Sequence, residues 1–541
     1  MATVAQRRRL LPRTRLSPAL GWKAWALRHA WFAPILLVAV WLRVTGIRGG
    51  FLYGDEAEYA IVARYLSRDL TFLAYPALEG FAPTPFVSQP PLILYFMAIS
   101  MKVFGPTDLA AVLPSVIFGI ATVAAVYALG NRLGGRFVGL SAAALLAVLP
   151  FHVELSRKAM LDAGYAFFLV LTAYFLVAWL QTRSRGHALG VGVATACAAL
   201  SKLPGMLAGF AVLLVFLVAL GIMLARRADA KAWKETAIQG GLGVAPVVVG
   251  AALYVGLLMY LQSLSALWTK LQWQLGRVDA DYAQVREATA VARPPSFYFT
   301  DPHFSFQAMM GGLVFALALV GLIVALLRFF TAPVKRTHHL VVPAMVGVLL
   351  AFFLYSERKE GFYLLPFAPF AAILVAEAAD GLRGMLNWAG IRVSALAPRA
   401  APIAIVGGLL LVAVPAMGAA VESYEDFALG QTQQQYFGYG TKEAAMWIHE
   451  QDPDAAQYGT LLGRFTLHWY NEQPAYHWYM DHTYLEGQIQ NGKLRYIVYD
   501  EYLNLAFDEQ YMRELINKYN GEMVQTYRAG WGEVKVFELH P

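Results

Sequence analysis

Long apolar runs, separated by short polar connections, occupy most of the chain up to residue 421. Eleven of them are candidate membrane-spanning helices, although several are shorter than the ~20 residues that a straight helix needs to cross the hydrocarbon core. They cover residues 31–42, 109–130, 137–153, 161–180, 188–201, 206–225, 238–261, 308–327, 340–354, 362–376 and 403–421. The pattern predicts an all-α polytopic membrane domain over residues 31–421, with about eleven transmembrane helices.

A further apolar stretch, residues 92–104, is short and follows Pro90 and Pro91. Counting it as a span would place Arg132 and Arg136 outside, against the excess of basic residues that cytoplasmic loops carry. We therefore expect a helix at the membrane surface, within a first outer loop of residues 48–108. A second outer loop is expected over residues 262–307.

Basic residues fall in every second connection between the predicted spans, and this bias predicts their orientation. Residues 1–30, rich in arginine, would form a basic cytoplasmic tail. We expect an integral protein of a bacterial inner or plasma membrane. The cytoplasmic connections would contain Arg132 and Arg136; Arg183 and Arg185; Arg226, Arg227, Lys231 and Lys234; Arg328, Lys335 and Arg336; and Arg383, Arg392 and Arg399.

The composition becomes polar and aromatic beyond residue 421. Residues 495–499 and 533–537 alternate like strands, whereas residues 442–450 and 508–519 have helical spacing. Segment 422–541 is therefore expected to be a small soluble α/β domain. An odd number of spans precedes it, which places it on the periplasmic or extracellular side.

The overall composition agrees with a lipid-embedded chain. Only 15% of the residues are charged, against roughly 25% in soluble proteins. The formal net charge of +7 does not indicate a nucleic-acid partner, because the basic residues lie in short loops between apolar runs. The single cysteine, Cys197, has no second cysteine for a disulfide or a metal site.

Acidic residues at the start of the first outer loop are the first candidates for chemistry. Asp55, Glu56 and Glu58 follow the first span directly, where carboxylates are costly unless they are hydrated, paired or used. The structural alternative is a helix N-terminus, because Asp55 and Glu58 have the spacing of a capping box. The residues alone leave both interpretations open.

Other polar groups are expected at the same membrane face. Asp162 opens a predicted span after Arg157 and Lys158, Lys202 lies in a short outer turn, and residues 357–360 form a charged connection. Taken singly, these could be an N-cap, a snorkelling lysine and a solvated loop. Together they offer cations for a lipid phosphate and carboxylates that could take a proton from a hydroxyl.

Five stretches, taken together, carry a resemblance to a known family. They are GDEAEYAIVARYL at 54–66, QPPLILYFMAISMKVFG at 89–105, RKAMLDAGYAFFL at 157–169, ALSKLPG at 199–205 and RKEGFYLLPFAPFAAIL at 358–374. They resemble, in family order and over roughly the first 380 residues, the integral membrane glycosyltransferases of the C-type (GT-C) fold, in the branch of protein O-mannosyltransferases and lipid A aminoarabinose transferases.

This resemblance implies an inverting transfer of a sugar from a polyprenyl-phosphate carrier. Asp55 would be the catalytic base, and Asp162 would orient the acceptor. No cofactor is certain; if a divalent metal such as Mg²⁺ or Mn²⁺ is bound, Asp55 and Asp162 would be its ligands. Lys202, with Arg358 or Lys359, would stabilise the leaving phosphate. The residues expected to bind substrate are Glu56, Glu58, Tyr59, Gln89, Arg157, Lys158, Lys202, Arg358, Lys359 and Tyr363.

The chain departs from the aminoarabinose branch at two positions. Glu58 stands where that branch has a basic residue, and Gln89 replaces a lysine before the Pro-Pro pair. Both changes remove positive charge near the expected donor phosphate. The resemblance therefore points to the general reaction rather than to aminoarabinose as the sugar or lipid A as the acceptor.

The sequence thus predicts a glycosyltransferase whose partners are a polyprenyl-phosphate-sugar donor, membrane lipids, and a lipid, glycan or protein acceptor. The alternative is a transporter or flippase of lipid-linked saccharides. Transporters place ionisable residues in mid-membrane, whereas here the predicted spans are almost free of charge and the polar groups lie at one face. This distribution favours the enzyme.

Overall fold

A computed structural model gives the structure of most of the chain. It describes residues 29–47, 52–69, 85–86, 88–265, 267–268, 272, 293–331, 336–356, 359–388, 439–460, 463–473, 475–477, 481–501, 506–529 and 532–541.

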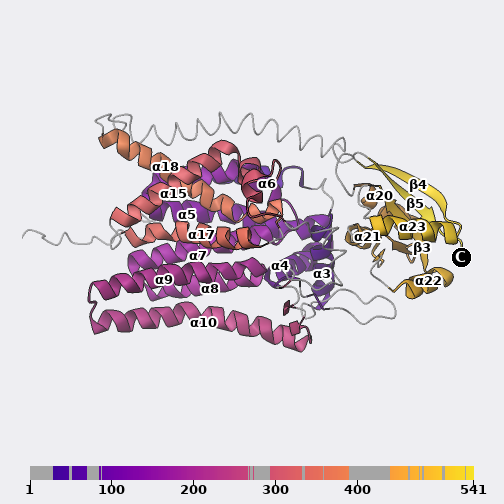
Figure 1. The fold of residues 1–541 in the computed structure, drawn as a ribbon, viewed down its shortest axis with the longest axis horizontal. Helices are drawn as coiled ribbons and strands as arrows, with labels where there is room; N and C mark the ends of the chain where they lie inside the picture. The colour runs from indigo at the N-terminus through magenta and orange to yellow at the C-terminus, as the bar shows by residue number, and fades with distance from the viewer. Residues whose placement is uncertain are drawn as a thin grey trace, which may run out of the picture.

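Most of the described residues up to 388 form a bundle of long helices, with the C-terminal domain beyond one end of it (Figure 1). Neighbouring helices pack in pairs, among them α7 with α8, α15 with α18, and α5 with both α7 and α18. The long helices are α2 (Phe32–Val44), α5 (Asp108–Val148), α7 (Asp162–Thr182), α8 (Arg185–Ser201), α9 (Leu207–Ala225), α10 (Ala230–Tyr260), α15 (Gly312–Thr331), α17 (Val341–Tyr355) and α18 (Phe367–Trp388). The short ones are α6 (Pro150–Leu155), η2 (Leu203–Met206), α13 (Phe297–Thr300), α14 (Phe306–Met310), η4 (Thr337–Leu340) and η5 (Gly361–Leu364).

Helices overlap every predicted span except the last, residues 403–421, which lies outside the described residues. Six segments are long and apolar enough to cross a membrane by length and composition. They are Asp108–Val148, Asp162–Thr182, Leu203–Ala225, Ala230–Tyr260, Gly312–Thr331 and Thr337–Tyr355. A polytopic helical membrane protein is thereby supported, whereas the count of eleven spans stays a prediction.

The predicted span 109–130 and most of the predicted span 137–153 lie in α5, on either side of a break in the helix, and the end of the second span continues into α6. The backbone leaves the helical region at Gly134 and at Gly135, whose φ of 77° and ψ of −169° are accessible essentially only to glycine. Gly130 and Gly139 approach closely across this break, since a Cβ on Gly130 would lie 2.8 Å from the Cα of Gly139. The glycines therefore make the turn between the two spans.

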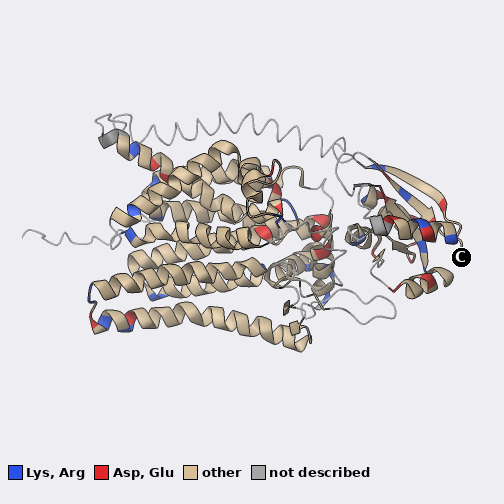
Figure 2. Ribbon diagram, viewed as in Figure 1, with Lys and Arg blue, Asp and Glu red and all other residues tan. Residues whose placement is uncertain are grey.

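Charged side chains are concentrated near the ends of the bundle. Figure 2 shows Lys and Arg gathered at the end away from the C-terminal domain, for example where α9 and α10 meet. Arg226 and Arg227 follow α9 there, and Lys231 and Lys234 open α10. This is the distribution from which the cytoplasmic end was predicted.

Two helices of the predicted first outer loop lie at the opposite end of the bundle, toward the C-terminal domain (Figure 1). They are α3 (Asp55–Asp69) and α4 (Leu92–Phe104), which pack on each other. With 13 residues, α4 is about 20 Å long, too short to cross the hydrocarbon core. A helix therefore forms where a surface helix was expected.

The C-terminal domain contains a five-stranded sheet in the order β2-β1-β3-β5-β4. The strands β1, β2 and β3 are parallel, whereas β5 pairs antiparallel with β3 and β4. Two separate hydrophobic cores lie on the sheet, one with α22 and α23 and the other with α20 and α21. The elements are α20 (Tyr439–Gln451), β1 (Ala456–Tyr458), α21 (Arg464–Asn471), β2 (Ala475–Tyr476), α22 (His482–Gln490), β3 (Leu494–Asp500), α23 (Ala506–Lys518), β4 (Glu522–Ala529) and β5 (Gly532–Glu538).

The contact between α15 and α18 generates a stability prediction. A Cβ at Gly321 would lie 1.8 Å from the carbonyl oxygen of Leu374, so Gly321→Ala forces the two helices apart. We expect a loss of about 1–3 kcal/mol, measured as a lower unfolding temperature in detergent. Gly347→Ala in α17 is the control, because nothing lies within 4 Å of its Cβ position. Equal unfolding temperatures for the two variants would contradict this packing.

Candidate active site

Asp55 is the first residue of α3, directly after Gly54. Gly54 has a φ of 55°, which favours glycine, and its carbonyl oxygen accepts the Glu58 N–H at 3.0 Å. Gly54 rather than Asp55 therefore precedes the first turn, and the capping-box interpretation of Asp55 is wrong. The Asp55 carboxylate makes no hydrogen bond or ion pair with any residue that the structure describes.

A buried ion pair joins Asp162 to Lys202. The Nζ of Lys202 lies 2.8 Å from each carboxylate oxygen of Asp162, and the two residues are 4% and 1% exposed. Asp162 opens α7, while Lys202 lies in extended backbone between α8 and η2. Lys202 thus points into the protein rather than snorkelling to a lipid interface.

Aromatic rings complete the surroundings of Lys202. Its Nζ lies 5.1 Å from the ring centroid of Phe362 and 5.2 Å from that of Tyr363, both in η5. Cations over ring faces at such distances are attracted by the ring quadrupole. A third element, the connection from α17 to α18, therefore meets the ion pair at this end of the bundle.

Helix α3 faces the same region. Asp55 lies within range for its charge to act on both Asp162 and Tyr59. Burial, reinforced by the charge of Asp55, raises the pKa of the Tyr59 hydroxyl well above its usual value. The structure thus brings together Asp55, Tyr59, Asp162, Lys202 and Tyr363.

Glu56 and Gln89 bind backbone near this cluster. The Oε2 of Glu56 accepts the Ala159 N–H at 2.9 Å, and the Oε1 of Gln89 accepts the Leu203 N–H at 3.2 Å. Burial raises the pKa of Glu56 to about 7, although the nearby Lys158 acts in the opposite direction. Both side chains fix the segments that carry the site.

The other residues that were expected to bind substrate make different contacts. Arg157 donates to the carbonyl oxygens of Leu42 and Thr45, at 2.9 and 2.6 Å, and so binds the end of α2. Lys158 pairs with Glu154 at 3.0 Å. Glu58, on α3, acts through its charge on Tyr59. Arg358 lies outside the described residues.

Lys359 is buried and binds Arg293, which belongs to the predicted second outer loop. Its Nζ donates to the carbonyl oxygens of Arg293, at 2.9 Å, and of Ser356, while Arg293 donates back to the Lys359 carbonyl at 2.7 Å. The sequence reasoning did not single out Arg293 for this contact. The sequence showed Arg293 only as one of several cations among the aromatic residues of that loop.

Asp55 and Asp162, the candidate metal ligands, are not part of a larger group of metal-binding side chains within the described residues. Both oxygens of Asp162 are bonded to Lys202. Within the described residues, no group of three or more His, Cys, Asp or Glu side chains could hold an ion. In this geometry the partner of the Asp162 carboxylate is therefore the ammonium group of Lys202.

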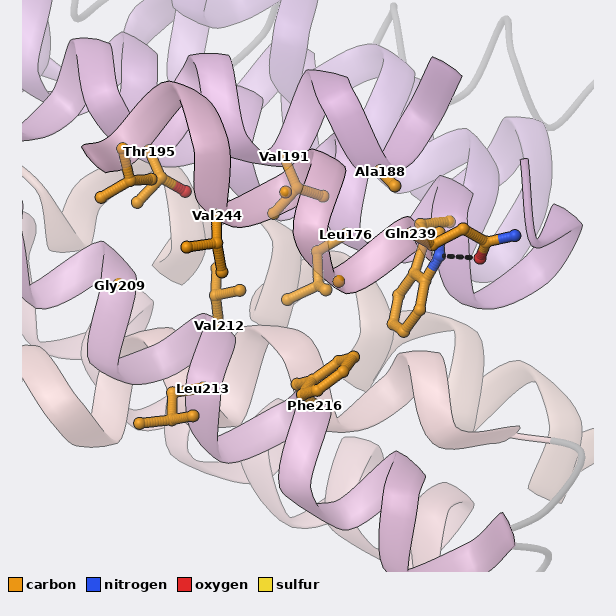
Figure 3. A pocket seen from close by; sticks show the side chains of 14 residues that line it. Leu176, Ala188, Val191, Thr195, Gly209, Val212, Leu213, Phe216, Gln239 and Val244 are labelled. Atoms are coloured by element: carbon orange, nitrogen blue, oxygen red, sulfur yellow. Dashed lines mark hydrogen bonds between the residues drawn. The ribbon is translucent and has the colours of Figure 1, made fainter. Parts of the chain in front are cut away.

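An apolar cavity of about 200 Å³ lies between α7, α8, α9 and α10 (Figure 3). Its polar contact joins the Trp179 Nε1, as donor, to the Gln239 Oε1 at 2.6 Å. Trp179 stands 17 residues after Asp162 on α7, about 25 Å along the helix axis. This polar contact therefore lies near the opposite end of the bundle from the ion pair, whereas Thr195 and Gly209 line the part of the cavity that is nearer to Lys202.

Comparisons with known proteins identify the fold. Residues 88–249 match the family model described as dolichyl-phosphate-mannose-protein mannosyltransferase. The structure of ArnT from Cupriavidus metallidurans bound to undecaprenyl phosphate is similar, with 17% identity, a TM-score of 0.63, and coverage of 94% of this chain and 98% of that chain. No curated protein matches the sequence.

A second similar structure is the oligosaccharyltransferase AglB from Archaeoglobus fulgidus, in complex with an inhibitory peptide and a dolichol-phosphate. It has 16% identity, a TM-score of 0.54, and coverage of 88% of this chain and 69% of that chain. The chain therefore has the GT-C fold. The resemblance to the integral membrane glycosyltransferases of this fold is confirmed.

The ion pair generates a prediction about stability. Lys202→Met leaves Asp162 buried without its cation, which costs about 3–5 kcal/mol. The double variant Asp162→Asn/Lys202→Met should regain most of this loss, since no unpaired charge remains. Unfolding temperatures in detergent measure both effects.

Lys158→Met is the matched control, because its pair with Glu154 has side chains 40% and 61% exposed and should contribute less than about 1 kcal/mol. A double variant no more stable than Lys202→Met would count against a paired role for Asp162.

The raised pKa of Glu56 predicts a pH dependence. Because this pKa is about 7 in the folded protein and lower in the unfolded chain, folding takes up a proton between the two values. The contribution to stability is present at low pH and is lost as the pH rises to about 7. Glu56→Gln should remove this component from unfolding temperatures measured between pH 5 and 8. If the unfolding temperatures of wild type and Glu56→Gln changed with pH in the same way, the raised pKa of Glu56 would be contradicted.

Proposed function

We propose that this protein transfers a sugar from a polyprenyl-phosphate-linked donor to an acceptor hydroxyl at the non-cytoplasmic face of a membrane, with inversion at the anomeric carbon. The observation that carries the proposal is the cluster at one end of the bundle. A carboxylate that the described residues leave unpaired, Asp55, lies beside the buried pair of Asp162 and Lys202. A lipid-linked substrate reaches such a site from the bilayer.

Asp55 is the general base in this proposal. It takes the proton of the acceptor hydroxyl while the acceptor oxygen forms a bond to the anomeric carbon. The bond from that carbon to the phosphate oxygen breaks on the opposite face of the sugar, and polyprenyl phosphate leaves with the bonding electrons. Asp162 is less suited to this role because Lys202 binds both of its oxygens.

Lys202 stabilises the negative charge that grows on the departing phosphate. A fixed cation in a site with little water acts strongly on such charge. Asp162 holds this cation in place before the donor binds, and the rings of Phe362 and Tyr363 limit its movement on another side. Tyr59, Gln89 and Glu56 form the wall of the same site.

The fold supports a polyprenyl-phosphate as the carrier of the sugar. The ArnT structure contains undecaprenyl phosphate and the AglB structure contains a dolichol-phosphate, and this chain shares their architecture. We place the reaction on the side of the C-terminal domain, because basic residues gather at the far end of the bundle (Figure 2). The sugar, hexose or pentose, and the lipid, glycan or protein acceptor are left for experiment to identify.

Asp55→Asn tests the proposal, because it keeps the size of the side chain and removes the base. We expect transfer to fall by about 10²–10⁴-fold while donor binding persists. In cells, mass spectrometry of polyprenyl-phosphate lipids should show one glycosylated carrier accumulating when the gene is deleted. Wild type should reverse the accumulation and Asp55→Asn should not.

Asp454→Asn, an exposed change in the C-terminal domain, is the control and should behave as wild type. An unchanged carrier pool on deletion would argue against polyprenyl-phosphate sugars as substrates. Full turnover by Asp55→Asn would remove Asp55 from the mechanism.

A further inference from the structure

Helix α21 belongs to the C-terminal domain, but one of its side chains packs in the membrane domain. Leu467 packs into a core of the C-terminal domain, and the Asn471 side chain donates to the Ala455 carbonyl oxygen at 3.0 Å. Trp469, in contrast, is only 5% exposed and belongs to the hydrophobic core of the membrane domain. One short helix therefore links the two domains directly.

The hydroxyl of Tyr470 connects this helix to the segment before Asp55. It accepts the Leu52 N–H at 2.8 Å and donates to the Oδ2 of Asp108 at 2.9 Å. Leu52 is three residues before Asp55, and Asp108 opens α5. A single hydroxyl thus fixes the entry to α3 relative to the start of a long bundle helix.

Asp108 receives further contacts from the same domain. Its Oδ1 accepts the Trp469 Nε1–H at 2.7 Å, and its Oδ2 lies 3.9 Å from the Nζ of Lys442. Lys442 also lies 4.9 Å from the ring centroid of Tyr470. These charge-assisted contacts hold α21 on the bundle.

Arg64 binds α21 from the other half of α3. Its guanidinium donates to the carbonyl oxygens of Trp469, at 3.2 Å, and His468, at 3.4 Å, and lies 4.8 Å from the Trp469 ring centroid. A cation is favourable at the C-terminus of a helix because the last carbonyls carry partial negative charge. Arg64 is 8% exposed, so few competing waters reach these bonds.

We infer that α21 sets the position of α3 and, through it, of the Asp55 carboxylate, with Tyr470 and Arg64 as positioning residues. The inference rests on the proposed function, since it gives these contacts a part in that reaction. Tyr470 holds the backbone before Asp55, and Arg64 holds the helix nine residues after it. A base must be placed precisely, because a misplacement of about 1 Å can lower a rate by about 10²-fold.

Tyr470→Phe tests the inference in the full-length protein. The change keeps the ring and removes the two hydrogen bonds of the hydroxyl. We expect kcat for sugar transfer to fall by about tenfold or more, with the KM for the donor within about twofold of wild type. In hydrogen–deuterium exchange, the Leu52 amide and the first turn of α3 should exchange faster.

Tyr499→Phe is the matched control. It removes a hydroxyl of the same domain that bonds to Glu509 at 2.9 Å, away from α3, and should leave kcat and exchange in α3 unchanged. Arg64→Lys is a second variant, which keeps the positive charge and loses the planar fork of donors. It should also lower kcat without changing the donor KM.

The outcomes separate this inference from the proposed function. A wild-type protein that transfers no sugar defeats the proposed function, whereas exchange in α3 still decides whether Tyr470 holds that helix. Wild-type kcat and wild-type exchange in Tyr470→Phe would overturn the positioning role. Faster exchange confined to the C-terminal domain, with unchanged kcat, would overturn it as well, because the hydroxyl would then serve only that domain.

Discussion

The ion pair between Asp162 and Lys202 is the interaction on which the arrangement of the site depends. Two charges removed from solvent require each other, because either one left alone costs several kcal/mol. Their pairing brings the start of α7 to the end of α8, and the rings of Phe362 and Tyr363 add the connection before α18. Asp162 is bonded to a cation, whereas Asp55 makes no hydrogen bond or ion pair within the described residues, so the two acids have different environments.

Much of the fold follows from hydropathy, because spanning helices need long apolar runs whatever their neighbours are. The limits of the elements depend on tertiary contacts. The apolar run ending at residue 376 continues as α18 to Trp388, since Arg328 of α15 pairs with Asp380 at 2.7 Å. At its other end, η5 replaces the first turn and turns Tyr363 toward Lys202. In the C-terminal domain, β1 and β2 have three and two residues, too few to show alternation.

The sequence alone identified the candidate site residues singly, but it did not show which residues each of them contacts. Asp162 and Lys202 are 40 residues apart, and each alone resembles an ordinary helix end. Arg157 and Lys158 are adjacent in sequence, yet one binds backbone of α2 and the other an exposed glutamate. Trp469 resembles a local core residue of a soluble domain, and only the three-dimensional structure reveals that its core is that of the membrane domain.

The contact between Arg64 and Trp469 has a consequence for the biogenesis of the protein. The two residues are separated by 405 positions, and ribosomes add about 5–20 residues per second. Helix α3, in the predicted first outer loop, is therefore synthesised about 20–80 s before its partner helix α21. During that interval the loop lacks the aromatic side chains that complete its core. A nascent chain that ends before residue 464 would leave the contacts of Trp469 with Arg64 and of Tyr470 with Leu52 unmade.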